Sequence, residues 1–179
     1  GFRGLAGSRR AGDGAAGDYF GRAVAVSGNY VVVGAFFDDD NGTNSGSAYI
    51  FAYDGSNWNQ VAKLTASDGK GNDQFGYAVA ISGDYAIVGA LEEDNENGID
   101  AGAAYIFERS GGSWIQTAKL IADDGAENDG FGIGVSIFGE HAIVGAVSDD
   151  DRGYSSGSAY VYQRSGGNWS QVAKLTADD

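Results

Sequence analysis

The stretch DGKGNDQFGYAVAISGDYAIVGA, residues 68–90, occurs three times in the chain with small changes. Its opening pattern, D-G-x-x-x-D-x-F-G, begins at Asp13, Asp68 and Asp124, so the period is 55 to 56 residues. A fixed period in this range is typical of repeat architectures, in which each unit buries its apolar face against a copy of itself. We therefore expect three stacked copies of one supersecondary unit.

The repeat also divides the chain. A Gly/Arg-rich tail, residues 1–12, precedes units that are expected to span residues 13–67, 68–123 and 124–179. Asp179 falls where a fourth unit would start, and residues 3–12 lack the W-x-Q-x-A-K-L-T pattern that precedes the later units. The three units are therefore expected to form an open arc, or a part of a larger propeller or assembly.

The composition narrows the fold class and the partners. The chain has 31 Gly, no Pro and 12% aromatic residues, which suits short strands joined by tight turns. A formal charge of −14 disfavours nucleic acid and anionic lipid surfaces, and leaves cations and basic partners as compatible ligands. Zero Cys excludes disulfides and thiol chemistry, and the lack of a long apolar run predicts no membrane insertion.

Each repeat contains four strand candidates. In the second repeat they are residues 78–81, 85–90, 103–108 and 114–122, and the other repeats carry equivalents, such as SAYIFA at 47–52 and WSQVAKLTA at 169–177. The first two strands are joined by a short turn in which Gly28, Gly83 or Gly139 is expected to adopt a positive φ. Four antiparallel strands in about 55 residues form one blade of a β-propeller, so the predicted class is all-β.

Two sets of aromatic residues recur in register. Phe20, Phe75 and Phe131 are interpreted as anchors between neighbouring blades. Trp58, Trp114 and Trp169 are interpreted as blade-packing residues, because each ring can bury about 150 to 250 Å². The alternative interpretation of the tryptophans is a set of aromatic platforms for sugar, which requires that they be exposed on one rim.

Phe-Gly followed by a hairpin that ends in Gly-Ala resembles the FG-GAP repeat, the blade motif of integrin α-chain propellers and of many bacterial surface and secreted proteins. The pairs that carry the resemblance are Phe20-Gly21 with Gly34-Ala35, Phe75-Gly76 with Gly89-Ala90, and Phe131-Gly132 with Gly145-Ala146. The resemblance covers residues 13–179 and is closer to a bacterial subfamily, since Gly-Ala is not followed by Pro. It implies propeller blades and an extracellular or cell-surface binding role. The Ca²⁺ loop of integrin blades is missing, because the hairpins read only SGNY, SGDY and FGEH.

An acidic loop follows each Gly-Ala and is the main candidate for a metal site. Its oxygen ligands suit Ca²⁺, although consecutive acids point different ways in an extended chain, so a solvated acidic loop is the alternative. The candidate ligands are Asp38, Asp39, Asp40, Glu93, Asp94, Asp149, Asp150 and Asp151, with Glu92 and Glu96 nearby. In a propeller these loops would share one face and make it strongly negative.

A second set of acids lies before each Phe-Gly. Asp commonly accepts hydrogen bonds from nearby backbone N–H groups and stabilises a turn, and we favour this role over cation binding. The set comprises Asp13 with Asp18, Asp68 with Asp73, and Asp124 with Asp129.

No catalytic motif is found. His141 is the only histidine, and it aligns with Tyr30 and Tyr85 at the same hairpin position. Neither a Ser-His-Asp spacing nor a phosphate-binding loop is present, so the chain is not expected to be an enzyme.

Three functions remain open. The first is a non-catalytic extracellular adhesion or ligand-binding propeller with a protein or glycan ligand. The second is a structural subunit that assembles head to tail into a ring or filament, because an open arc exposes two apolar sheet faces. In the competing account, further blades of a longer chain cover those faces. The third is a lectin that binds sugar between blades.

Overall fold

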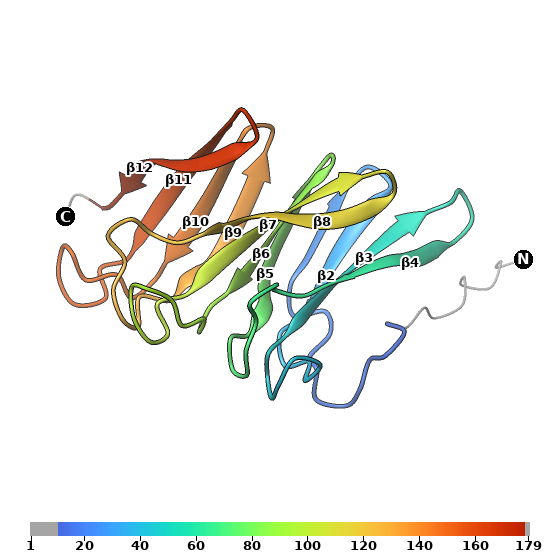
Figure 1. Ribbon diagram of the computed structural model, residues 1–179, viewed down its shortest axis with the longest axis horizontal. Helices are drawn as coiled ribbons and strands as arrows, with labels where there is room; N and C mark the ends of the chain where they lie inside the picture. The colour runs from blue at the N-terminus through green and yellow to red at the C-terminus, as the bar shows by residue number, and fades with distance from the viewer. Residues whose placement is uncertain (1–10, 178–179) are drawn as a thin grey trace, which may run out of the picture.

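The computed structural model describes residues 11–177, which form three four-stranded antiparallel sheets and no helix (Figure 1). The first sheet contains β1 (Val24–Ser27), β2 (Tyr30–Ala35), β3 (Ser47–Tyr53) and β4 (Trp58–Leu64). The second contains β5 (Phe75–Ser82), β6 (Tyr85–Ala90), β7 (Ala103–Ser110) and β8 (Ser113–Leu120). The third contains β9 (Phe131–Phe138), β10 (His141–Ala146), β11 (Ser158–Ser165) and β12 (Asn168–Leu175). The predicted all-β class with one sheet per repeat is confirmed.

Each sheet is a meander in which consecutive strands pair. The turns that join the first two strands contain two residues, and Gly28, Gly83 and Gly139 have φ values of 56°, 59° and 58°. The positive φ predicted for these glycines is therefore confirmed. β5 begins at Phe75, three residues before the predicted start, because Phe75 itself pairs with Ala90 across a register shift.

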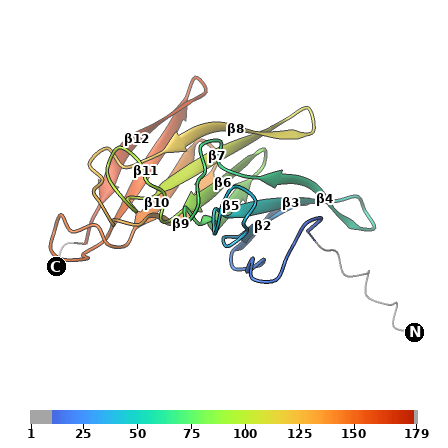
Figure 2. The ribbon, with the colours of Figure 1, turned by 60° about the horizontal axis from the view of Figure 1, so that its bottom comes forward.

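The three sheets follow one another along the chain, as Figure 2 shows from a second direction. Side chains from β2, β3 and β5–β7 form one apolar core between the first and second sheets, and a second core lies between the second and third. Neighbouring sheets pack most closely at their first two strands, whereas the fourth strands barely touch. This splayed arrangement is that of blades in a propeller, and the three blades do not close into a ring.

The glycines of the repeat motif meet across the boundary between blades. A Cβ on Gly34 would lie 2.0 Å from the carbonyl oxygen of Gly76 in the next blade. A Cβ on Gly89 would lie equally close, 2.0 Å, to the carbonyl oxygen of Gly132. The glycine of Gly-Ala in one blade and that of Phe-Gly in the next are thus required for the same backbone contact.

The phenylalanines of the motif fill these boundaries. Phe75 and Phe131 are each 1% exposed in the cores between blades, and each donates its backbone N–H to a carbonyl oxygen of the preceding blade. Phe20 is 44% exposed, because no described residue forms a blade before the first. Within residues 11–177 no helix is long and apolar enough to cross a membrane.

Candidate functional site

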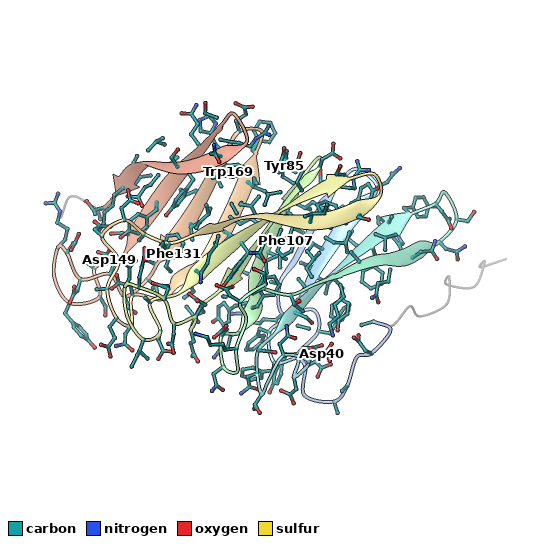
Figure 3. All side chains as sticks on the ribbon, viewed as in Figure 1. Asp40, Tyr85, Phe107, Phe131, Asp149 and Trp169 are labelled. Atoms are coloured by element: carbon teal, nitrogen blue, oxygen red, sulfur yellow. The ribbon has the colours of Figure 1, made fainter. Side chains whose placement is uncertain are left out.

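The acidic loops of all three blades lie along one edge of the molecule, at the bottom of Figure 1. They occupy residues 36–46, 91–102 and 147–157, between the second and third strands of each sheet. The side-chain view places Asp40 and Asp149 at this edge, and Tyr85 and Trp169 at the opposite one (Figure 3). We call the first edge the acidic rim.

In each blade, a lysine on the fourth strand forms ion pairs with acids of the acidic loop. In the first blade, Lys63 on β4 donates to Asp13 at 2.7 Å and to Asp38 at 3.0 Å, and also contacts Asp40. The hydroxyl of Tyr49 lies 2.9 Å from Asp13 and 2.8 Å from Asp38. One ammonium group thus joins acids from the segment before Phe-Gly and from the acidic loop.

The same lysine cluster recurs in the other blades. Lys119 contacts Asp68 at 2.7 Å and Glu93 at 2.6 Å. Lys174 contacts Asp124 at 2.9 Å and Asp149 at 2.8 Å, together with Asp151. The recurrence of Lys in the A-K-L pattern was the sequence signal for this cluster, but the strand interpretation assigned no role to it.

Burial and hydrogen bonding set the charges of each cluster. Asp38, Glu93 and Asp149 are 3%, 3% and 2% exposed. Burial opposes ionisation of Asp38, but hydrogen bonds from Lys63 and Tyr49 outweigh it and lower the pKa of Asp38. Burial likewise opposes the charge of Lys63, yet its acidic partners raise its pKa. Asp38 and Lys63 are therefore both ionised near neutral pH, and the lysine neutralises part of the acidic loop.

The consecutive acids do point in different directions. In the first and third loops, the first and third acids contact lysine. The second acid of the first loop, Asp39, instead accepts a hydrogen bond from the backbone N–H of Asn44, and Asp94 at the equivalent position of the second loop accepts one from the backbone N–H of Asp100. Among residues 11–177 no group of three or more acids or histidines is placed to hold a metal ion. Ca²⁺ binding by Asp38, Asp39, Asp40, Glu93, Asp94, Asp149, Asp150 and Asp151 stays a prediction.

The second set of acids divides into two roles. Asp13, Asp68 and Asp124 join the lysine clusters. Asp18, Asp73 and Asp129 are nearly buried, and each accepts a hydrogen bond from the backbone N–H three residues earlier, at 2.6 to 2.7 Å. These three acids close the turn before Phe-Gly, with the donor on the N-terminal side of the acid.

Asp73 offers a test of this electrostatic arrangement. Burial, with the nearby charges of Glu93 and Asp94, raises the pKa of Asp73 to about 6, although the hydrogen bond from Lys70 opposes the shift. A raised carboxyl pKa means that the folded state binds the proton more tightly, so stability is lost as pH rises from about 4 to about 6. We expect Asp73→Asn to remove this loss and to stabilise the protein by about 1 to 2 kcal/mol at pH 7.

Chemical denaturation across pH 3.5 to 7.5 would measure the effect of Asp73→Asn. The two proteins should be about equally stable at the acidic end of this range, and the variant should be the more stable one near neutral pH. Glu127→Gln, at an exposed acid, should stay close to the wild type throughout. A profile of Asp73→Asn that runs parallel to the wild type would contradict the assignment.

The acidic rim is hollowed at the third blade. A hollow of about 410 Å³ lies between residues 126–129 and 148–155 and is lined by Glu127, Asp129, Asp150 and Tyr154 among others. A smaller one, of about 240 Å³, adjoins it at the boundary of the second and third blades and shares Asn128 and Ser148. Tyr154 is 97% exposed, so its ring is available to a ligand.

The opposite edge carries the tryptophans. Trp114 packs against Tyr30 of the preceding blade at 6.1 Å between ring centroids, and Trp169 packs against Tyr85 at 6.4 Å. Arg109 and Arg164 lie over the same two tyrosine rings. Two of the three tryptophans therefore pack between blades, while Trp58 is 36% exposed and contacts Tyr53 of its own blade.

These features define a class of protein: an all-β repeat protein of propeller blades with an acidic rim. A family model described as FG-GAP repeat matches residues 10–51, 58–107 and 114–162, and the chain belongs to the FG-GAP repeat family. The resemblance drawn from the Phe-Gly and Gly-Ala pairs is thereby confirmed. Such repeats are typical of propeller-type ligand-binding or structural domains, are typically found in extracellular proteins, and are typically not enzymes.

The crystal structure of Saccharomyces cerevisiae Sqt1 is similar to this chain with a TM-score of 0.54 and 12% sequence identity. The match covers 89% of this chain and 37% of the Sqt1 chain. At this identity the similarity concerns the fold alone. No curated protein matches the sequence.

Proposed function

We propose that the protein is a non-catalytic, extracellular ligand-binding propeller that binds basic segments of partner proteins at its acidic rim. The observation that supports this function is the hollow of about 410 Å³ at the third blade, whose lining includes three acids and the exposed Tyr154. An adhesive role follows if the partner is itself fixed to a surface.

The charge of the rim favours a cationic ligand. Lysine neutralises only part of each acidic loop, and Glu127 and Asp150 remain exposed at the hollow. The net charge of −14 attracts a basic partner from a distance and repels an acidic one. The ring of Tyr154 can stack on the guanidinium of an arginine, a contact that adds to the ionic attraction.

Binding to arrays of proteins, glycans and arginine-rich peptides, with and without Ca²⁺, tests the proposal. We expect binding to basic peptides that weakens with salt, and a loss of about tenfold in affinity for the double variant Glu127→Gln/Asp150→Asn. The matched control is Glu140→Gln, an exposed acid in the hairpin between β9 and β10, which should bind as the wild type does. Equal binding by all three proteins, or no binding to any probe, would refute the acidic rim as the site.

Thermal unfolding with and without Ca²⁺ tests the predicted Ca²⁺ site. A rise in melting temperature with Ca²⁺ that is lost in Asp94→Asn and Asp150→Asn would place the ion in the acidic loops. Unchanged melting in Ca²⁺ would leave those loops as solvated acids.

Sugar binding is a second candidate because Trp58 and Tyr53 form an exposed ring pair, with 5.2 Å between centroids. Saccharides that stack on this pair should change tryptophan fluorescence, and Trp58→Ala should abolish the change. Fluorescence that responds to no saccharide would remove this candidate.

A further inference from the structure

We propose that a second copy of this chain docks head to tail, with the outer face of its third sheet on the outer face of the first sheet. We call the outer face of the first sheet face A and the outer face of the third sheet face B. This inference is independent of the ligand proposed above. It stands on how closely the two faces match the two boundaries that already exist inside the chain.

Face A repeats the surface that the second and third sheets bury. Phe20, Val24 and Val26 are 44%, 68% and 66% exposed. Their equivalents in the second blade, Phe75, Val79 and Ile81, are 1%, 8% and 7% exposed. Face A therefore has the side chains of a buried boundary, and none of residues 11–177 covers them.

Face B repeats the surface that the first and second sheets bury on their other side. Ile143 and Leu175 are 36% and 50% exposed. The equivalent Ile87 and Leu120 of the second blade are 0% and 3% exposed. Faces A and B are thus the two halves of one boundary, which the chain forms twice internally.

The motif glycines at the two faces also leave space for the backbone of another blade. Gly34 and Gly89 each meet a Phe-Gly glycine of the next blade, whereas a Cβ on the equivalent Gly145 would have 3.6 Å to its nearest neighbour. On face A, a Cβ on Gly21 would meet nothing within 4 Å. A second copy would bring Gly145 and Gly21 into the contact that Gly34 makes with Gly76.

The tyrosine and arginine positions of the internal boundaries carry other residues on faces A and B. At each internal boundary a tyrosine, Tyr30 or Tyr85, lies under an arginine and beside a tryptophan of the next blade. On face B the tyrosine position is taken by the exposed His141. On face A the arginine position is taken by Tyr53, beside Trp58, and Asn29 stands where the later blades have an acid that pairs with the arginine.

The exchange favours a copy of this chain as the occupant. At the internal boundaries the cation comes from the following blade and the aromatic ring from the preceding one. In the proposed junction, the imidazole ring of His141 comes from the preceding blade and the rings of Tyr53 and Trp58 from the following one, so ring contacts take the place of the tyrosine, arginine and tryptophan of the internal boundaries. Heterologous contact of this kind closes into a ring or extends into a filament.

Light scattering after size-exclusion chromatography, over a range of concentrations, tests self-association. We expect the wild-type mass to rise with concentration, and Val24→Lys on face A or Leu175→Lys on face B to be monomeric alone. Because each variant keeps one intact face, mixing the two should form a one-to-one dimer. Ile115→Lys, at an exposed position of the second blade, should assemble as the wild type does. Circular dichroism verifies that all variants are folded.

Two further variants address the junction itself. Tyr53→Arg should weaken association about tenfold, because the arginine would find neither the tyrosine ring nor the acid that it contacts at the internal boundaries, and Tyr53→Arg/His141→Tyr should restore it by recreating the tyrosine–arginine contact. A wild-type protein that stays monomeric at high concentration overturns the proposal. Variants with single altered faces that fail to pair on mixing overturn the head-to-tail geometry, and neither result bears on binding at the acidic rim.

Discussion

Gly89→Ala is expected to destabilise the protein by about 3 kcal/mol and to lower its melting temperature by about 6 to 12 °C. The added Cβ would lie 2.0 Å from the carbonyl oxygen of Gly132, which is backbone of the neighbouring blade and cannot rotate away as a side chain could. Relief requires the second and third blades to separate, which exposes the core around Phe131. Thermal and urea unfolding would measure both quantities.

Gly145→Ala is the matched control for Gly89→Ala. Gly145 holds the same place in the repeat and is also a strand residue without a positive φ, but a Cβ there would have 3.6 Å of space. At concentrations that keep the protein monomeric, Gly145→Ala should change stability by less than about 0.5 kcal/mol. Equal destabilisation by the two variants would show that the glycines matter for strand conformation and not for the approach of the blades.

Lys63→Met is expected to cost about 3 kcal/mol, because it leaves the buried carboxylate of Asp38 without its cation while keeping the apolar stem of the side chain. The pKa values of Asp13 and Asp38 are lowered largely by this lysine, so their contribution is present above the ordinary aspartate pKa and is lost as pH falls through the lowered value. The stability difference between wild type and variant should therefore shrink below about pH 4.

Urea unfolding of Lys63→Met at pH 7 and pH 3 provides the measurement. Adding Asp38→Asn should recover part of the lost stability, because it removes the unpaired buried charge. Arg152→Met, at an exposed cation of the third acidic loop, should lie within about 0.5 kcal/mol of the wild type. If Lys63→Met and Arg152→Met behaved alike, the lysine cluster would be no more than a surface ion pair.

The acidic loops were visible in the sequence, but their chemistry was not. Three consecutive acids in each loop suggest metal ligands. The order of residues does not indicate which lysine meets these acids in the folded protein. Lys63 is separated from Asp38 by 25 residues and from Asp13 by 50. The antiparallel pairing of β3 with β4 and the return of the chain before Phe-Gly bring them together, and both depend on the folded blade.

The tryptophans were open to two interpretations for a similar reason. Their equal spacing indicates equal places in each blade, yet exposure depends on whether a blade precedes them. The rings of Trp114 and Trp169 pack against tyrosines of a preceding blade, whereas the ring of Trp58 packs against Tyr53 of its own blade. Identical local sequence therefore leads to different environments along the arc.

The repeat, the four strands in each unit and the hairpin glycines could be predicted from the sequence. Strand alternation and turn conformation are local properties, and a period of 55 to 56 residues displays them three times. The folded structure was needed to show that Gly34 and Gly89 serve contacts with the next blade and that a lysine lies among the acids of each loop. These features arise where residues of different repeats or distant strands meet, and such meetings are set by packing rather than by the order of residues.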